Sequence, residues 1–240
     1  METDYIPFCG TPPLPGELLM RWTFDPWLLA GLAIVLGLGL RKATDRRRFA
    51  LGWAIAALLF VSPICAASMA LFSARVGQHI LLTLVAAPLI AASLPKARLP
   101  ALPMAATFAA LFWVWHAPAP YAATLASDLV YWSMHLSLAG AALLLFSALL
   151  AAPERGVPAI AVTGAQMTGF AVLLTLSPEP WHAWHALTTA PFGFTALGDQ
   201  QLAGGLMWVG GGGVFTVLVG WLALHFLRSD ATSAETGRVN

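Results

Sequence analysis

Long apolar runs separated by short polar connections fill almost the whole chain. The runs lack the strict alternation of a transmembrane barrel strand, and several approach the ~20 residues with which a helix crosses a bilayer. The pattern predicts seven transmembrane helices, over residues 26–40, 49–64, 71–94, 101–115, 129–151, 157–177 and 203–227. We therefore expect an all-α, polytopic membrane bundle over residues 26–227, with an N-terminal tail over 1–25 and a C-terminal tail over 228–240.

Composition supports a bilayer as the solvent of this chain. Of its 240 residues, 59% are hydrophobic and only 10% are charged, and the mean hydropathy is +0.76. One soluble core cannot bury that many apolar side chains, so membrane lipid is the expected surrounding. The net charge of +1 says nothing about nucleic acid, because the basic residues are clustered by topology, but the lack of a basic patch interleaved with aromatic residues argues against nucleic-acid binding.

The basic residues predict an orientation. They gather on alternate connections: the stretch 41–48, then 96–98, then Arg155, and finally Arg228 and Arg238. Because cytoplasmic loops carry the excess of Lys and Arg, these connections are expected on the cytoplasmic side. The N-terminus is then outside and the C-terminus inside.

The third apolar run, 71–94, carries three polar residues within its apolar length. Arg75, Gln78 and His79 stand at i, i+3 and i+4, so they share one helical face that must look into the bundle. We expect this face to lie near His135 and the start of the seventh helix. The other buried polar residues expected around it are Asp128, Asp199 and Gln200, with Asp199 or Asp128 as the counter-ion of Arg75.

Soft and nitrogen ligands gather toward the predicted outer face. Thiolate, thioether and imidazole together suit Cu(I), so this face is a candidate copper site. The candidate ligands are Cys9, Cys65, Met69, His79, His116, His135 and Met207. His182 and His185, in the outer segment WHAWH, have a spacing compatible with chelation on one helical turn.

Each candidate also has a purely structural interpretation. Cys9 and Cys65 are also suited to a disulfide in an oxidising compartment. The WHAWH segment resembles an aromatic belt at a membrane interface. Polar neighbours inside the bundle would satisfy His79 and His135 without a metal.

A stripe of small and polar residues marks the seventh helix. Gln200, Gly204, Met207 and Gly211 stand at i, i+4, i+7 and i+11. Such a stripe lets another helix pack closely against it. The run Gly210–Gly213 is expected to serve the same close packing.

Three segments resemble the CtaG family of cytochrome c oxidase assembly factors. They are SPICAASMALFSARVGQHILLTLVAAPLI, WHAPAPY and LGDQQLAGGLMWVGGG. In the first, Gln78, His79 and Pro88 match the family pattern, whereas Arg75 stands where many members have a first His. The second contains Trp115, His116, Pro118 and Tyr121 of the family's W-H-x-P-x-x-Y, and the third contains Asp199, Gln200, Gln201, Met207 and Trp208 of D-Q-Q-L-A-G-x-x-M-W.

The resemblance implies seven transmembrane helices in a bacterial inner membrane, cytochrome c oxidase subunits as partners, and copper insertion from the periplasmic side. An enzyme is not expected, because the chain shows no Ser/His/Asp set, phosphate loop or paired carboxylates. Two alternatives stay open: a membrane protein that holds b-type haem between His79 and His135, and a small-solute or metal transporter using Arg75 and the glycine run.

Overall fold

The computed structural model describes residues 5–236, with side chains up to residue 221 and at Leu224. Over these residues the chain is helical and contains no strand, and a helix lies at each of the seven predicted segments. The all-α prediction is therefore confirmed. The longer helices are α1 (Pro26–Lys42), α2 (Arg46–Val61), α4 (Phe72–Ile80) continuing through η2 (Leu81–Ala86) into α5 (Ala87–Ser93), α6 (Ala101–His116), α8 (Asp128–Ala151), α9 (Val157–Leu176) and α10 (Ala196–Thr236).

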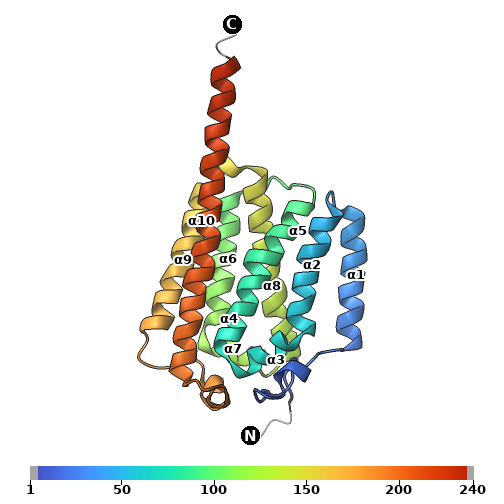
Figure 1. Ribbon diagram of the computed structural model, residues 1–240, viewed down its shortest axis with the longest axis vertical. Coiled ribbons are helices and arrows are strands. Elements are labelled where there is room, and N and C mark those ends of the chain that lie inside the picture. Colours follow the sequence, from blue (N-terminus) through green and yellow to red (C-terminus); the bar gives the residue numbers. More distant parts are fainter. Residues whose placement is uncertain (1–4, 237–240) are drawn as a thin grey trace.

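Connections alternate between the two ends of the bundle (Figure 1). One end, called the tail end below, holds residues 5–25, the short helices α3 (Pro63–Ala70) and α7 (Pro118–Thr124), and the α9–α10 loop. The other, the basic end, holds the loops α1–α2, α5–α6 and α8–α9. Of the predicted ligands, Cys9, Cys65 and Met69 lie at the tail end with His182 and His185, whereas the basic loops lie at the opposite end.

Not every helix is long enough to cross a bilayer. By length and composition, four helices in the described part qualify: Phe72–Ser93, Asp128–Ala151, Val157–Leu176 and Ala196–Trp221. The pair α2 and α3, bent by 52° at its break, makes a fifth if it is counted as one span. Since α1 has 17 residues and α6 has 16, each is about 25 Å long, less than the ~30 Å of a hydrocarbon core.

Two of the helices differ most from their predicted bounds. The second predicted span, 49–64, ends at Val61, because Ser62 caps a new helix and Pro63 occupies its first position; residues expected in a loop form α3. The seventh, 203–227, begins at Ala196 and continues to Thr236, so most of the predicted C-terminal tail is helical as far as the structure describes it. Figure 1 shows this helix projecting beyond the basic end.

The third span is interrupted at its centre. Six residues of π-helix, Leu81–Ala86, separate α4 from α5, and Pro88 follows at the second position of α5. A proline lacks the N–H that the α-helical pattern requires, and π segments occur frequently at functional sites. Thr83 Oγ1 donates to the carbonyl oxygen of His79 at 2.6 Å, which satisfies this acceptor where the helix changes pitch.

The small-residue stripe of α10 packs against α9, as predicted. A Cβ on Gly204 would lie 2.4 Å from Thr175 Oγ1 and 2.9 Å from the Ala171 carbonyl oxygen, so only glycine allows this approach. The glycine run does not serve the same purpose throughout, because a Cβ at Gly213 would meet nothing within 4 Å.

Candidate metal centre

Three buried histidines meet inside the bundle, each from a different helix. His79 lies on α4, His116 ends α6 and His135 lies on α8. The ring of His79 is 5.4 Å from that of His116 and 5.1 Å from that of His135, centre to centre. All three are at least 94% buried. The predicted approach of His79 to His135 is confirmed, and His116 joins them.

Backbone hydrogen bonds orient two of these rings in the same way. Nδ1 of His116 bonds to the Phe112 carbonyl at 2.7 Å, and Nδ1 of His135 bonds to the Tyr131 carbonyl at 2.9 Å. A carbonyl only accepts, so each Nδ1 carries the proton and each Nε2 has a free lone pair when the ring is neutral. This arrangement is typical of metal-binding histidines, whose second nitrogen is fixed by a hydrogen bond.

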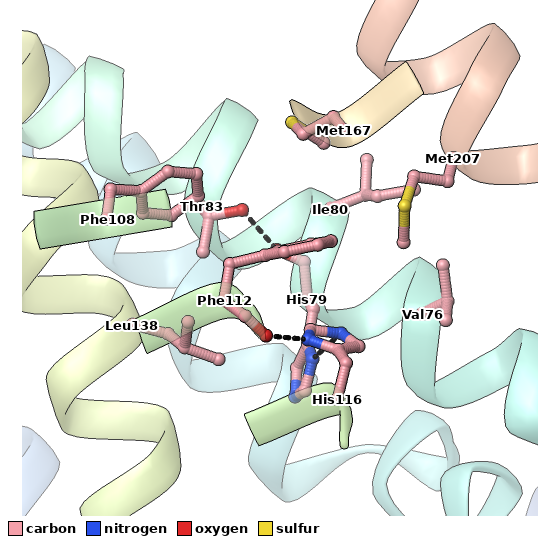
Figure 2. A pocket seen from close by; sticks show the side chains of 10 residues that line it. All are labelled: Val76, His79, Ile80, Thr83, Phe108, Phe112, His116, Leu138, Met167 and Met207. Carbon is pink, nitrogen blue, oxygen red and sulfur yellow. Dashed lines mark hydrogen bonds between the residues drawn. The ribbon is translucent and has the colours of Figure 1, made fainter. Parts of the chain in front are cut away.

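His79 completes the cluster with a weaker contact. Its Nδ1 lies 3.5 Å from His116 Nε2, as Figure 2 shows. Nε2 of His79 and Nε2 of His135 are buried without a hydrogen-bond partner. Unpaired buried polar atoms are costly and uncommon in folded proteins, so these lone pairs call for a functional explanation.

A small cavity beside the histidines brings in two thioethers. Its volume is about 10 Å³, about the space of one water-sized probe, and it is lined by His79 and His116 together with Met167 and Met207. Both methionines approach from the α9–α10 side of the cavity (Figure 2). Met207 was a predicted ligand, whereas Met167 was missed. Its only sequence signal is the neighbouring Gln166, an amide within an otherwise apolar helix.

The donor set fits a soft monovalent ion better than a harder one. Among the residues that the structure describes, no three His, Cys, Asp or Glu side chains are arranged to hold a metal together. A site built from His79 and His116 would therefore be completed by thioether sulfur. Imidazole with thioether suits Cu(I), whereas carboxylate and carbonyl oxygen suit Mg, Ca or Mn.

The same geometry leaves little room for haem between His79 and His135. Ligand pockets measure about 300–1,000 Å³, but the cavity lined by His79 measures about 10 Å³. A groove of about 570 Å³ between α1, α2 and α8 is lined by His135 and not by His79. Neither of these two spaces is lined by both rings.

The two cysteines form a disulfide. Cys9 and Cys65 are joined with their Cα atoms 5.3 Å apart, which ties the N-terminal tail to α3. This is one of the two alternatives that the sequence left open, and thiolate ligation by this pair would first require reduction. The phenol of Tyr131 lies 3.2 Å from Cys9 Sγ and 3.7 Å from Cys65 Sγ.

Arg75 is fully buried, as expected, but its predicted counter-ion is wrong. In the described part of the chain neither Asp199 nor Asp128 forms an ion pair with it. Its guanidinium instead lies 5.5 Å from the ring centre of Tyr121 and 5.6 Å from that of Tyr131. Nη2 also contacts Met69 Sδ at 3.5 Å, so this thioether faces a cation and not the histidines.

Both carboxylates have other partners. Asp199 caps α4 by accepting from the backbone N–H of Phe72 at 2.6 Å and of Ser73 at 3.2 Å, and from the Ser73 hydroxyl. Asp128 accepts from the phenol of Tyr5 in the tail. The first turn of a helix has N–H groups with no intrahelical acceptor, and this explains why Asp199 pairs with backbone and not with Arg75.

The remaining predicted polar residues bind helices together. Gln78 Nε2 donates to the Leu59 carbonyl oxygen at 2.8 Å, from α4 to α2. Gln200 Nε2 donates to the Leu174 carbonyl oxygen at 3.2 Å, from α10 to α9, and Gln200 Oε1 accepts from Trp181 N at 2.7 Å. These contacts are structural.

One of three comparisons with known proteins finds a match. The family model described as cytochrome c oxidase caa3 assembly factor (Caa3_CtaG) matches residues 41–107 and 99–229. The chain therefore belongs to this family, which confirms the resemblance found in its sequence. No curated protein and no solved structure matches the chain.

Proposed function

We propose that this protein assists assembly of cytochrome c oxidase by holding Cu(I) inside the bundle and delivering it from the tail end to oxidase subunits. The observation that carries the proposal is the cavity lined by His79, His116, Met167 and Met207, beside two free imidazole lone pairs. The role is non-enzymatic: the copper is cargo, and the protein supplies ligands, shape and access.

The charge around the centre favours release over permanent storage. Arg75 lies within cation–π distance of Tyr131, and the Tyr131 ring lies 4.3 Å from that of His135. A fixed positive charge near the site opposes a bound cation, more strongly in an apolar interior than in water. Neutral ligands and a nearby cation together favour a moderate affinity, which suits an assembly factor that must give its ion away.

The proposed direction of delivery follows from topology. We propose that all seven helices cross the bacterial inner membrane, with local thinning of the bilayer at the shorter α1 and α6, and that the tail end is periplasmic and the basic end cytoplasmic. Support comes from the stretch 41–48 and the other basic connections, which share one end of the bundle. Copper would then enter and leave on the periplasmic side.

The test of function uses a deletion strain complemented with wild-type or variant protein. His79→Phe and His116→Phe each keep an aromatic ring while removing the ligand nitrogens. We expect oxidase protein to be present but poor in copper, measured as copper per oxidase with this factor quantified in the same membranes. Normal oxidase copper in both variants would refute the proposal. Leu187→Ala is the control, since Leu187 is 85% exposed in the α9–α10 loop.

Reporter fusions test the orientation. Fusions after Arg48 and Arg98 should behave as cytoplasmic, whereas fusions within 65–68 and 182–189 should behave as periplasmic. An exchange between the two groups would overturn the periplasmic delivery.

A further inference from the structure

The two histidines of the α9–α10 loop differ in a way that their shared motif conceals. His185 is satisfied: its Nε2 lies 2.6 Å from the Tyr121 hydroxyl, and its Nδ1 lies 3.4 Å from the Ala70 carbonyl oxygen. His182 is only 5% exposed, yet neither of its ring nitrogens has a hydrogen-bond partner. A buried polar group without a partner costs about 1–3 kcal/mol, so packing alone does not explain a histidine here.

The position of His182 is fixed by its surroundings. Its ring stacks on Tyr121 with 4.0 Å between ring centres and lies 4.6 Å from the Phe72 ring. The tryptophans on either side anchor the loop: Trp181 N donates to Gln200 Oε1 at 2.7 Å, and Trp184 Nε1 donates to the Met69 carbonyl oxygen at 2.8 Å. The unpaired nitrogens therefore belong to a held ring and not to a loose loop.

His182 also lies in the electrostatic neighbourhood of the buried cluster. Burial, and after it the charges of His185, His116 and Arg75, lower the pKa of His182 to about 3. The ring is accordingly neutral at physiological pH, with one nitrogen lone pair free. Of the three clustered histidines, His116 is the one that acts electrostatically on His182, and its Nε2 lies 3.5 Å from His79 Nδ1.

We propose that His182 is the entry ligand through which Cu(I) passes between the tail end of the protein and the centre at His116 and His79. This inference rests on the proposed function and adds the route to it. Cu(I) keeps its single positive charge throughout: a bond to His116 Nε2 forms as the bond to His182 breaks, and no proton or electron moves. In this step the bond from His116 Nε2 to the metal replaces the 3.5 Å contact between His116 Nε2 and His79 Nδ1.

The experiment measures the rate and the extent of copper loading separately. Detergent-purified full-length protein is mixed under reducing conditions with Cu(I) held by a coloured chelator, and loss of the chelate colour gives both quantities. His182→Phe keeps the stacking on Tyr121 and Phe72 but removes both nitrogens. We expect it to reach the wild-type extent of loading about tenfold more slowly, the lower end of the effect of losing a supporting group at a metal site. His182→Met, which restores a soft donor, should load at nearly the wild-type rate.

Several outcomes of this experiment would overturn the entry role of His182 or the proposed function. Wild-type loading rates in His182→Phe would overturn the entry role, and so would a His182→Phe protein that binds no Cu(I) at equilibrium, because His182 would then belong to the final site. Equal slowing in His182→Phe and His182→Met would assign the effect to packing. A wild-type protein that takes up no Cu(I) would refute the proposed function itself. Leu187→Ala, in the same loop, is the matched control, and if His182→Phe does not fold, loading that is slower in His182→Met than in Leu187→Ala would overturn the entry role.

Discussion

The cysteine pair and the histidine cluster lie on two sides of Tyr131, yet their potential metal ligands are in opposite chemical states. The Tyr131 phenol contacts Cys9 Sγ at 3.2 Å, and its ring lies 4.3 Å from that of His135. The sulfurs are consumed in a disulfide that holds the tail on α3. The imidazoles keep lone pairs that no hydrogen bond uses.

This difference shows why residue type alone does not locate a metal site. Cysteine is the softest ligand in the chain, and the sequence therefore ranks it with the histidines. Within the fold, a ligand must also offer a free lone pair toward a shared space. His79 meets that requirement at the cavity, and His116 meets it once its Nε2 gives up the 3.5 Å contact with His79, whereas the cysteines meet it only after reduction.

Removal of the imidazoles is expected to have the largest effect on Cu(I) binding. His79→Phe and His116→Phe should each weaken Cu(I) binding by at least about 100-fold, since even outer partners of metal ligands are worth about 10–100-fold. His135→Phe should weaken it less, because His135 does not line the cavity. Competition titration with a Cu(I) chelator measures all three. Equal, small losses in the three variants would place the copper elsewhere.

The next largest effect is expected at the disulfide, and it should fall on the tail. Cys9→Ser with Cys65→Ser removes a bond that closes a sequence separation of 56 residues, a constraint worth about 2–4 kcal/mol. We expect the tail to become sensitive to protease and the level of the protein to fall. Limited proteolysis and membrane quantification measure this.

Copper binding in the same double variant separates the two regions. A structural disulfide predicts Cu(I) affinity close to wild type in the purified double variant. If the cysteines instead act as reduced ligands, bound Cu(I) should drop under reducing conditions while the amount of protein stays normal. That second result would return Cys9 and Cys65 to the ligand set.

The sequence predicts the helices well because apolar length is a local property. The inward face of Arg75, Gln78 and His79 is equally local, since helical spacing alone determines it. The hydrogen-bond and ion-pair partners of a buried side chain depend instead on which helices meet, and helical spacing does not determine them. Asp199 was expected to pair with Arg75, but it caps α4 from the start of α10, and this choice depends on how the two helix ends meet.

Met167 illustrates the same limit at the candidate site. Apart from the neighbouring Gln166, nothing in the sequence of α9 distinguishes this methionine from a packing residue. Its relevance depends on Gly204, which lets α10 approach α9 closely, and on Met207, which reaches the same cavity from α10. The cavity exists only where five helices meet, namely α4, α6, α8, α9 and α10, so sequence periodicity cannot predict it.

Removal of the thioethers beside the histidine cluster should have a smaller effect on Cu(I) binding. Met207→Leu and Met167→Leu nearly conserve volume, so each should cost less than about 1.5 kcal/mol of stability. We expect each to weaken Cu(I) binding moderately and the double variant to weaken it more, because a weaker donor is lost while both imidazoles remain. Chelator competition beside thermal unfolding separates affinity from stability. An affinity unchanged in the double variant would restrict the site to the imidazoles.

The smallest expected effect lies at the tail, where Tyr5 donates to Asp128. Burial first, and then this hydrogen bond and the charge of Asp128, raise the pKa of Tyr5 to about 12. A phenol whose pKa is raised on folding contributes its stabilisation below its ordinary pKa of about 10 and loses it as the pH rises through about 12. Tail attachment should therefore not change with Tyr5 ionisation between about pH 6 and 9.

Tyr5→Phe removes one hydrogen bond at an exposed site, worth about 1 kcal/mol or less. While the disulfide is intact, this loss should be invisible to protease, because Cys9 still fixes the tail four residues later. In the Cys9→Ser, Cys65→Ser background the same substitution should speed cleavage of the tail by up to about fivefold, the equivalent of about 1 kcal/mol. Identical cleavage rates with and without the Tyr5 hydroxyl in that background would show that the hydrogen bond contributes nothing to holding the tail.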